Sequence, residues 1–230
     1  MNKTVKKKAA KTTKAQKEIK STKGSAALIN FTIDGQPVQA REGWTVLETA
    51  REYGFHIPTL CFHEAVLPSG ACRLCVVEAR QGDWSKVVIS CLYPPWEGVE
   101  ILSNSPRVQN VRRWILEMLL AACPASTEIR QLAREYGVTA TEFKIEHPEE
   151  ECLRCGLCVR VCEEIVGAQA ICFGSRGVAK QITTPYMVPT ASCVSCGCCV
   201  AVCPTGAMKT RIDQIRGDIS QRTGHGSAHY

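Results

Sequence analysis

Hydrophobic and polar residues alternate along Leu28–Ile33, where a polar N-terminal segment gives way to a patterned chain. This period of two is typical of a strand with one buried face. The next two residues, Asp34 and Gly35, are a strong signal for a two-residue turn, and a return strand is expected over 37–40. The pattern therefore predicts an N-terminal β-hairpin.

A short helix is expected directly after the hairpin. Thr45 and Glu48 have the spacing of a capping box and Gly54 is a suitable helix stop, so we predict a helix over 46–53. A cysteine-bearing loop follows this helix. Further strands are then expected near residues 75–80, 86–92 and 99–102. Hairpin, helix, loop and strands together predict a compact α+β unit over residues 26–104.

The apolar residues take up the period of a helix after residue 104. Ser105 and Pro106 are typical of a helix start, and the periodicity predicts one helix to about residue 122 and another over 128–136. We expect each helix to turn one apolar face to a core, and we assign neither face any chemistry. These faces comprise Val111, Trp114, Ile115, Met118 and Leu119 in the first helix, and Ile129, Leu132, Ala133 and Tyr136 in the second. Residues 105–145 are therefore predicted to be a helical linker.

An eleven-residue run occurs twice in the rest of the chain. Residues 152–162 return as residues 193–203, and seven of the eleven positions are identical. Each copy reads C-x2-C-x2-C-x3-C, the bacterial run for a [4Fe–4S] cluster, which Pro204 completes in the second copy and Glu163 alters in the first. Zinc sites usually use two separated C-x2-C pairs, so the third and fourth cysteines favour iron–sulfur clusters over zinc.

The fourth cysteine of each run is expected to serve the cluster of the other run, as in two-cluster ferredoxins. Gly156 and Gly197 are expected to make the tight turns that bring the other three thiols together. On this pattern one cubane is held by Cys152, Cys155, Cys158 and Cys203, and the other by Cys193, Cys196, Cys199 and Cys162. The crossed ligands make residues 146–212 one bacterial-type 2[4Fe–4S] ferredoxin domain with two adjacent clusters.

Another group of cysteines lies in the N-terminal unit. Cys61, Cys72, Cys75 and Cys91 have the spacing C-x10-C-x2-C-x15-C. The plant-type [2Fe–2S] pattern is C-x4-C-x2-C with a distant fourth cysteine, so the middle pair and the last cysteine agree while the first gap is longer. From these residues alone, a [2Fe–2S] cluster, a zinc site and free thiols all stay open.

The chain resembles a known family around these cysteines. His56-Ile-Pro-Thr-Leu-Cys61, Gly70-Ala-Cys-Arg-Leu-Cys-Val-Val-Glu78 and Ser90-Cys91 are similar to the N-terminal ferredoxin domain of the complex I large iron–sulfur subunit. The same domain occurs in the small diaphorase subunit of NAD-reducing hydrogenases, and in related formate dehydrogenases and [FeFe] hydrogenases. The resemblance covers the chain from about residue 27 to residue 211. It implies a β-grasp fold for the N-terminal unit and a [2Fe–2S] cluster on Cys61, Cys72, Cys75 and Cys91.

One feature of that family is missing from the sequence. Relatives usually hold a further [4Fe–4S] cluster on His-x3-Cys-x2-Cys-x5-Cys between the two domains, whereas residues 103–151 contain only Cys123 and His147 as matching ligand types. One thiol cannot hold that cluster, so we expect it to be absent. The three cysteines outside the quartets, Cys123, Cys172 and Cys198, are expected to be small buried hydrophobic residues. Cys198 aligns with Leu157 of the first run, which predicts a hydrophobic slot for it.

Composition and charge narrow the class of protein. Fifteen cysteines would suggest a disulfide scaffold in a short secreted chain, but the N-terminus is a lysine run without the apolar core of a signal peptide. No apolar stretch is long enough to span a bilayer, so we expect these thiols to act as metal ligands in a reducing cytoplasm.

The basic charge is confined to one end of the chain. Residues 1–24 contain nine Lys and one Glu, so the rest is acidic although the whole chain carries +6. We expect residues 1–25 to be a disordered basic tail and residues 213–230 to be a loose C-terminal tail. The lysine run has no interleaved aromatic residues, so no nucleic-acid binding is expected.

We therefore expect a non-catalytic electron-transfer subunit of a multi-subunit oxidoreductase. The sequence contains no Rossmann glycine motif, P-loop or acid–base set, so a flavin-containing NAD(P)H subunit and a catalytic redox subunit are expected as partners in a hetero-oligomer. The resemblance implies that the catalytic partner handles hydrogen, formate, a quinone or another low-potential substrate. Two alternatives stay open: a reductase or bifurcating subunit with an unrecognised cofactor, and a zinc-stabilised basic adaptor.

Overall fold

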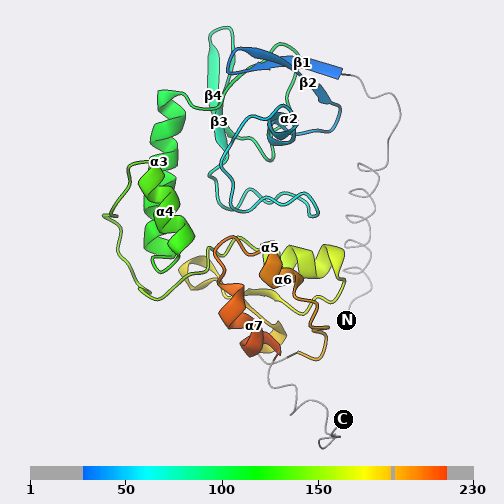
Figure 1. Cartoon of the computed structure of the whole chain (residues 1–230), viewed down its shortest axis with the longest axis vertical. Helices are drawn as coiled ribbons and strands as arrows, with labels where there is room; N and C mark the ends of the chain where they lie inside the picture. The colour runs from blue at the N-terminus through cyan, green and yellow to red at the C-terminus, as the bar shows by residue number, and fades with distance from the viewer. Residues whose placement is uncertain (1–27, 188–189, 217–230) are drawn as a thin grey trace, which may run out of the picture.

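The computed structural model describes residues 28–187 and 190–216 of the chain. The predicted tail of residues 1–25 and most of the predicted C-terminal tail lie outside the described residues. Three parts follow one another within them: an N-terminal sheet unit, a pair of helices at its side and a C-terminal unit of short elements (Figure 1). No helix in the described ranges is long and apolar enough to cross a membrane.

A five-stranded mixed sheet forms the N-terminal unit. Its strands are β1 (Leu28–Ile33), β2 (Gln36–Arg41), β3 (Val76–Gln81), β4 (Trp84–Ile89) and β5 (Glu100–Leu102), in the order β2-β1-β5-β3-β4. β1 pairs antiparallel with β2 and parallel with β5, while β3 pairs antiparallel with β4 and β5. Helix α2 (Val46–Glu52) contributes Val46, Leu47 and Ala50 to the same buried core as the strands. This arrangement confirms the expected α+β class and β-grasp fold.

Local sequence signals position the hairpin and α2. Asp34 and Gly35 both have positive φ, 49° and 79°, as the type I′ hairpin turn requires. The amide of Thr45 donates to Glu48 Oε2 at 2.8 Å, and the amide of Glu48 donates to Thr45 Oγ1 at 3.2 Å. Both the predicted hairpin and the predicted capping box are therefore present.

The strand predicted over residues 86–92 begins and ends earlier, as β4. Gln81 pairs with Trp84, so only two residues connect β3 to β4. Gly82, with a φ of 56°, allows this tight connection. The prediction was wrong at both ends, because the turn at residues 82–83 starts the strand at Trp84, two residues before the predicted start, and the strand ends at Ile89.

Helices α3 (Pro106–Ala122) and α4 (Thr127–Glu135) form the predicted helical linker beside the sheet (Figure 1). Ser105 caps α3 by accepting from the amide of Val108 at 3.3 Å, and Ser126 caps α4 by accepting from the amide of Ile129 at 3.3 Å. Both helices bury side chains in one apolar cluster with the cysteine-bearing loop of the N-terminal unit. The helices thus extend the core of the sheet unit.

The predicted apolar face of α3 is wrong at two positions. Trp114 is 61% exposed and Met118 is 48% exposed. The buried stripe instead includes Arg112, whose guanidinium donates to the carbonyl oxygens of Leu74 at 3.4 Å and Val76 at 2.7 Å. Hydrophobic periodicity misplaced the face because a buried cation occupies its centre.

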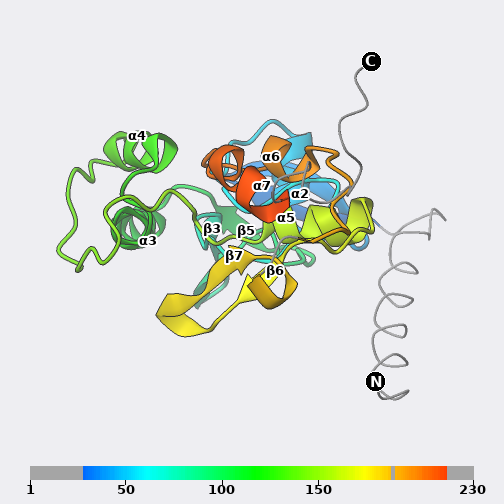
Figure 2. The ribbon, with the colours of Figure 1, turned by 90° about the horizontal axis from the view of Figure 1, so that it is seen from below.

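Short elements around the two cysteine runs form the C-terminal unit. They are α5 (Leu157–Arg160), a π-helix (Val161–Ile165), β6 (Cys172–Gly174), a 3-10 turn (Gly177–Ala179), β7 (Gln181–Thr183), a 3-10 turn (Pro185–Met187), α6 (Cys198–Ala201) and α7 (Met208–Arg216). The β6–β7 hairpin extends to one side, away from α6 (Figure 2). Helix α7 continues past residue 212, where the sequence predicted the domain to end.

The two cysteine runs adopt the same backbone conformation. Gly156 and Gly197 both have a φ of 74°, and each precedes the first residue of a short helix, α5 or α6. Two residues before each glycine, Arg154 and Ser195 have φ values of 56° and 57°. The predicted glycine turns are therefore present, and the repeat in sequence is a repeat in structure.

Candidate metal centres

Four predicted ligands meet in the N-terminal unit, and we call them the N-terminal quartet: Cys61, Cys72, Cys75 and Cys91. Each is at most 4% exposed. They lie on the loop between α2 and β3 and on the segment directly after β4. Their thiols form two hydrogen-bonded pairs, Cys61 with Cys72 and Cys75 with Cys91. The amide of Cys72 also donates to Cys61 Sγ at 3.3 Å.

Pairing changes the acidity of these thiols. The hydrogen bond from the Cys72 thiol lowers the pKa of Cys61 to about 5, and the bond from the Cys91 thiol lowers the pKa of Cys75 to about 7. The pKa values of Cys72 and Cys91 are raised, chiefly because each thiol donates to its partner. One thiol of each pair is therefore readily deprotonated, which is the form that binds a metal.

Two pairs of cysteines suit a binuclear centre better than a single ion. Zinc needs four ligand atoms around one point. A [2Fe–2S] cluster is held by four cysteines shared between two irons, so the paired thiols fit it.

Buried donors hold the backbone around the N-terminal quartet. Ser90 Oγ donates to the carbonyl of Cys75 at 2.7 Å, and the amide of Ser90 donates to the same oxygen at 3.0 Å. Arg112 bonds the carbonyls on either side of Cys75, those of Leu74 and Val76. No local sequence pattern indicates this role for Ser90 or Arg112, because both contacts depend on elements brought together by the fold.

The structure brings the other eight predicted ligands together in two sets across the repeat. One small cavity is lined by Cys152, Cys155, Cys158 and Cys203, which we call the Cys152 quartet. A second is lined by Cys162, Cys193, Cys196 and Cys199, which we call the Cys193 quartet. The fourth cysteine of each run lies with the first three of the other run. This is the crossed arrangement expected of a two-cluster ferredoxin.

The surroundings of both cavities are largely apolar. Leu157, Ile182 and Met208 line the first, and Ile171 and Ile212 line the second. Burial raises the pKa of Cys155 to about 11 and that of Cys199 to about 11. A positive metal centre is then needed to hold these thiols as thiolates. Each cavity offers the four soft sulfur atoms of a predicted ligand set in an apolar shell, with Cys198 as a fifth cysteine at the second cavity, and such donors suit an iron–sulfur cluster.

Backbone amides also point at sulfur in the C-terminal unit. The amide of Ala170 donates to Cys162 Sγ at 3.3 Å, and the amide of Arg154 donates to Cys152 Sγ at 3.4 Å. Such donors stabilise thiolates and tune the potential of a bound cluster. The Ala170 contact comes from the linker between the runs, which the repeat did not indicate.

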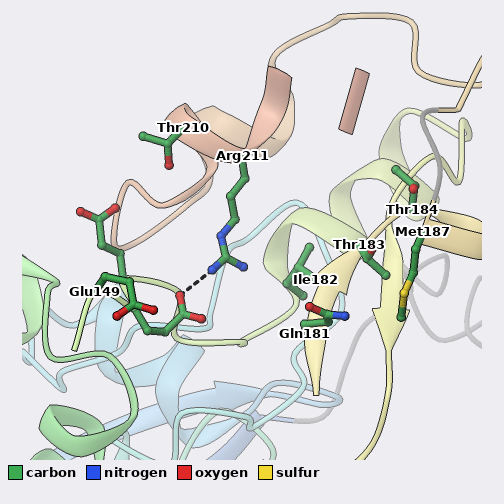
Figure 3. A pocket seen from close by; sticks show the side chains of 10 residues that line it. Glu149, Gln181, Ile182, Thr183, Thr184, Met187, Thr210 and Arg211 are labelled. Atoms are coloured by element: carbon green, nitrogen blue, oxygen red, sulfur yellow. Dashed lines mark hydrogen bonds and ion pairs between the residues drawn. The ribbon is translucent and has the colours of Figure 1, made fainter. Parts of the chain in front are cut away.

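A polar cavity borders the Cys152 quartet, between β7 and α7 (Figure 3). Glu150 forms an ion pair there with Arg211 at 2.6 Å and accepts from the amide of Cys152 at 2.7 Å. Burial opposes ionisation of Glu150, but the Cys152 amide and Arg211 outweigh it and lower the pKa of this carboxyl. The ion pair thus ties the start of the first run to α7, a role that no sequence motif indicated.

The cysteines outside the quartets occupy different environments. Cys123 is fully buried at the end of α3 and its thiol donates to the carbonyl of Leu119 at 3.1 Å, which confirms the expected buried position. Cys172 is only partly buried on β6. Cys198 is also partly buried and its thiol bonds that of Cys196, so it does not fill the buried slot that Leu157 occupies.

Apolar packing connects the three quartets in a row. Cys155 packs against the apolar cluster that contains Cys61 and Cys72 of the N-terminal quartet. Cys152 and Cys158 share the core of the C-terminal unit with Cys162 and Cys199. Among the described residues, no member of the Cys193 quartet belongs to the cluster around the N-terminal quartet. The Cys152 quartet therefore lies between the other two.

Both domains match established families. A family described as 2Fe-2S iron-sulfur cluster binding domain matches residues 26–106. A family described as 4Fe-4S dicluster domain matches residues 151–207. These matches confirm the two classes of domain expected from the cysteine spacing and from the resemblance.

Curated relatives combine these domains within longer chains. The NADPH-Fe(3+) oxidoreductase subunit alpha of Geobacter sulfurreducens is 32% identical over 180 residues, which cover 68% of this chain and 21% of the relative. The NADH-ubiquinone oxidoreductase 75 kDa subunit of Reclinomonas americana is 27% identical over 207 residues, 80% of this chain and 30% of the relative. The chain thus spans less than a third of the length of these relatives.

A solved structure is also related to this chain over most of its length. A chain of the NAD+-reducing [NiFe]-hydrogenase in the H2-reduced state is 33% identical to this one, with a TM-score of 0.60. The match covers 69% of this chain and 75% of the hydrogenase chain. Sequence and fold therefore agree over most of both molecules.

Proposed function

Because the chain belongs to the family of iron–sulfur proteins that includes the matched chain of the NAD+-reducing [NiFe]-hydrogenase and the 75 kDa subunit of NADH-ubiquinone oxidoreductase, we propose that it is an electron-transfer subunit of a multi-subunit oxidoreductase. The observation that carries this proposal is the row of three four-cysteine sets, linked by contacts of Cys155. Iron–sulfur clusters bound there would accept and release single electrons. The chain's own residues hold, space and shield these centres.

The proposed cofactors are one [2Fe–2S] cluster and two [4Fe–4S] clusters. We assign the [2Fe–2S] cluster to the N-terminal quartet, Cys61, Cys72, Cys75 and Cys91. One [4Fe–4S] cluster is assigned to Cys152, Cys155, Cys158 and Cys203, and the other to Cys193, Cys196, Cys199 and Cys162. Paired thiols support the first assignment, and the crossed lining of the two cavities supports the others.

The order of the centres follows from the same contacts. The Cys152 quartet is the middle position, with the N-terminal quartet on one side and the Cys193 quartet on the other. Cys196, in the outer quartet, is exposed, whereas all four cysteines of the N-terminal quartet are buried. The loop around Cys196, with Val194 65% exposed, is therefore the surface on which we propose that one redox partner docks.

The proposed partners are a flavin-containing NAD(P)H subunit and a catalytic redox subunit. The names of the relatives support an NAD(P)H link, because they are an NADPH-Fe(3+) oxidoreductase, an NADH-ubiquinone oxidoreductase and an NAD+-reducing hydrogenase. The given sequence contains no dinucleotide motif, and we propose that a separate subunit supplies the flavin. We propose a reducing cytoplasm as its compartment, because the ligand thiols must stay reduced to bind iron.

Metal analysis and an activity assay test this proposal. Anaerobically purified protein should contain about ten iron atoms per chain, the content of one [2Fe–2S] and two [4Fe–4S] clusters. The same preparation should not oxidise NADH with an artificial dye as acceptor, because the proposal assigns the flavin to a partner subunit. Zinc in place of iron would contradict the cluster assignment and favour an adaptor, and NADH turnover by the isolated chain would favour a catalytic reductase.

A further inference from the structure

Arg160 of the C-terminal unit reaches into the N-terminal unit. Its Nη2 donates to the carbonyl oxygen of Cys61 at 2.9 Å, and its Nη1 donates to the carbonyl oxygen of Leu67. Both acceptors lie on the loop that carries the first ligand of the N-terminal quartet. These contacts join residues more than ninety positions apart in the sequence.

The position of Arg160 in the chain ties it to both other quartets. It is the last residue of α5, two residues after Cys158 and two residues before Cys162. Cys158 belongs to the Cys152 quartet, and Cys162 belongs to the Cys193 quartet. Arg160 therefore bonds the ligand loop of one centre while its backbone lies between ligands of the other two.

The charge of Arg160 has no acidic partner among the described residues. Its two hydrogen bonds go to neutral carbonyls, and its buried Nε has no hydrogen-bond partner. The nearby carboxylate of Glu164 accepts from the amide of Leu67 at 2.8 Å instead. A half-buried cation without a counter-charge is costly. Four thiolates around an oxidised iron–sulfur core leave about two negative charges, which would supply that counter-charge.

We propose that Arg160 is a positioning residue for electron transfer between the units: it fixes the Cys61 loop against α5 and raises the reduction potential of the centre in the N-terminal quartet. This inference rests on the proposed function, because it assumes bound clusters. A fixed positive charge favours the reduced, more negative state of a nearby centre. Removing it makes that centre harder to reduce.

Glu164 provides a charge of opposite sign at the same interface. Glu164→Gln keeps an oxygen that accepts from the amide of Leu67 but removes the negative charge. It should therefore shift the potential of the N-terminal centre upward, opposite to Arg160→Gln. If both substitutions acted only by loosening the interface, their potential shifts would not have opposite signs.

Potentiometric EPR titration of the anaerobically purified holoprotein tests the proposal. Arg160→Gln should lower the equilibrium constant for reduction of the [2Fe–2S] centre about tenfold. For a one-electron couple this is a downward shift of about 59 mV in its reduction potential. Arg160→Lys keeps the positive charge, so its equilibrium constant for reduction of the [2Fe–2S] centre should stay within about threefold of the wild-type value. Arg130→Gln removes an exposed arginine on α4 and should change nothing.

The outcomes separate the inference from the proposed function. Wild-type protein without iron would contradict the proposed function itself. Full iron content with an unchanged [2Fe–2S] potential in Arg160→Gln would overturn the role of Arg160 alone. If Arg160→Gln fails to retain iron, Glu164→Gln decides: an upward shift supports the charge effect, and an unchanged or lowered potential overturns it.

Discussion

The hydrogen bonds at sulfur differ between the proposed ligand Cys162 and the cysteine at the end of α3, Cys123. The amide of Ala170 donates to Cys162 Sγ at 3.3 Å, and a donor directed at sulfur stabilises the thiolate. The thiol of Cys123 instead donates to the carbonyl of Leu119, and burial raises the pKa of this thiol to about 12. Cys123 lines neither of the two cavities formed by the repeat, and it remains outside the proposed ligand sets.

Neighbouring cysteines in the second run give a matched pair of variants. Cys199→Ser should lose the iron of one cubane, about four atoms per chain, because a hydroxyl is a poor ligand for a site built from soft thiolates. Cys198→Ser should keep the iron content and spectra of the wild type, although Cys198 borders the same cavity. Iron analysis and EPR measure both effects. Loss of a cluster in Cys198→Ser would show that the register assigned to the repeat is wrong.

At the scale of secondary-structure elements, the two short helices α5 and α6 differ in what surrounds their first turn. Gly156 and Gly197 share a φ of 74°, but a Cβ on Gly156 would come within 2.5 Å of the Phe173 ring on β6. A Cβ on Gly197 would meet nothing within 4 Å. The first glycine is required by its backbone conformation and by packing, and the second by its conformation alone.

Alanine at these two glycines should therefore have unequal effects. Each variant carries the strain of a positive φ, about 1 kcal/mol. Gly156→Ala must also displace the Phe173 ring, which Lys180 Nζ contacts at 3.8 Å from the ring centroid. We expect the lower denaturation midpoint and the greater loss of iron in Gly156→Ala. Equal losses in the two variants would show that β6 does not restrain the first run.

A single carboxylate connects three elements of the N-terminal half. Glu78 on β3 is 3% exposed and accepts from Ser105 Oγ at 2.5 Å and from Ser85 Oγ at 2.7 Å. Ser105 is the N-cap of α3 and Ser85 lies on β4. The Ser105 and Ser85 hydroxyls, with help from Arg80, lower the pKa of Glu78. This carboxylate thus anchors α3 to the sheet.

Replacing this carboxylate should destabilise the fold in a pH-dependent way. Glu78→Gln should cost about 1–3 kcal/mol of unfolding free energy at neutral pH, because hydrogen bonds to a buried charged group are lost. The part of this stabilisation that depends on the charge of Glu78 is fully present above the ordinary pKa of 4.5. It is lost as the pH falls through the lower pKa that Glu78 has in the folded protein. Denaturant titrations at several pH values measure it. As a control, Glu52→Gln at an exposed position on α2 should show no such loss. A difference in unfolding free energy between the wild type and Glu78→Gln that does not change with pH would contradict the lowered pKa.

Sequence reasoning succeeded where the signal was local. The turn at Asp34, the capping box at Thr45 and the glycine turns of the repeat each depend on a few adjacent residues. It failed for the buried face of α3, because Arg112 pairs with carbonyls of a distant loop and breaks the hydrophobic pattern. Spacing and resemblance indicated the twelve proposed ligand cysteines, whereas neither indicated the residues that support them.

At the scale of the whole molecule, the interface between the two ferredoxin units sets the order of the centres. Cys155 packs beside Cys61 and Cys72, while Arg160 and Glu164 bond the loop of the N-terminal unit. These contacts join segments far apart in the sequence, so cysteine spacing alone could not give the order of the three centres. Helices α3 and α4 pack against the loop that carries Cys61 and Cys72. Electron transfer in this account runs through three centres in one chain.

The proposed row of three centres can be tested by EPR spin quantification of the fully reduced holoprotein. Three bound clusters should give about three spins per chain: one from a [2Fe–2S] cluster and two from [4Fe–4S] clusters whose signals broaden each other through their proximity. A matched Cys61→Ser sample should lose the [2Fe–2S] spin and keep the interacting pair. Fewer than three spins in wild-type protein with full iron content, or two cubane signals without mutual broadening, would contradict the proposed row of centres.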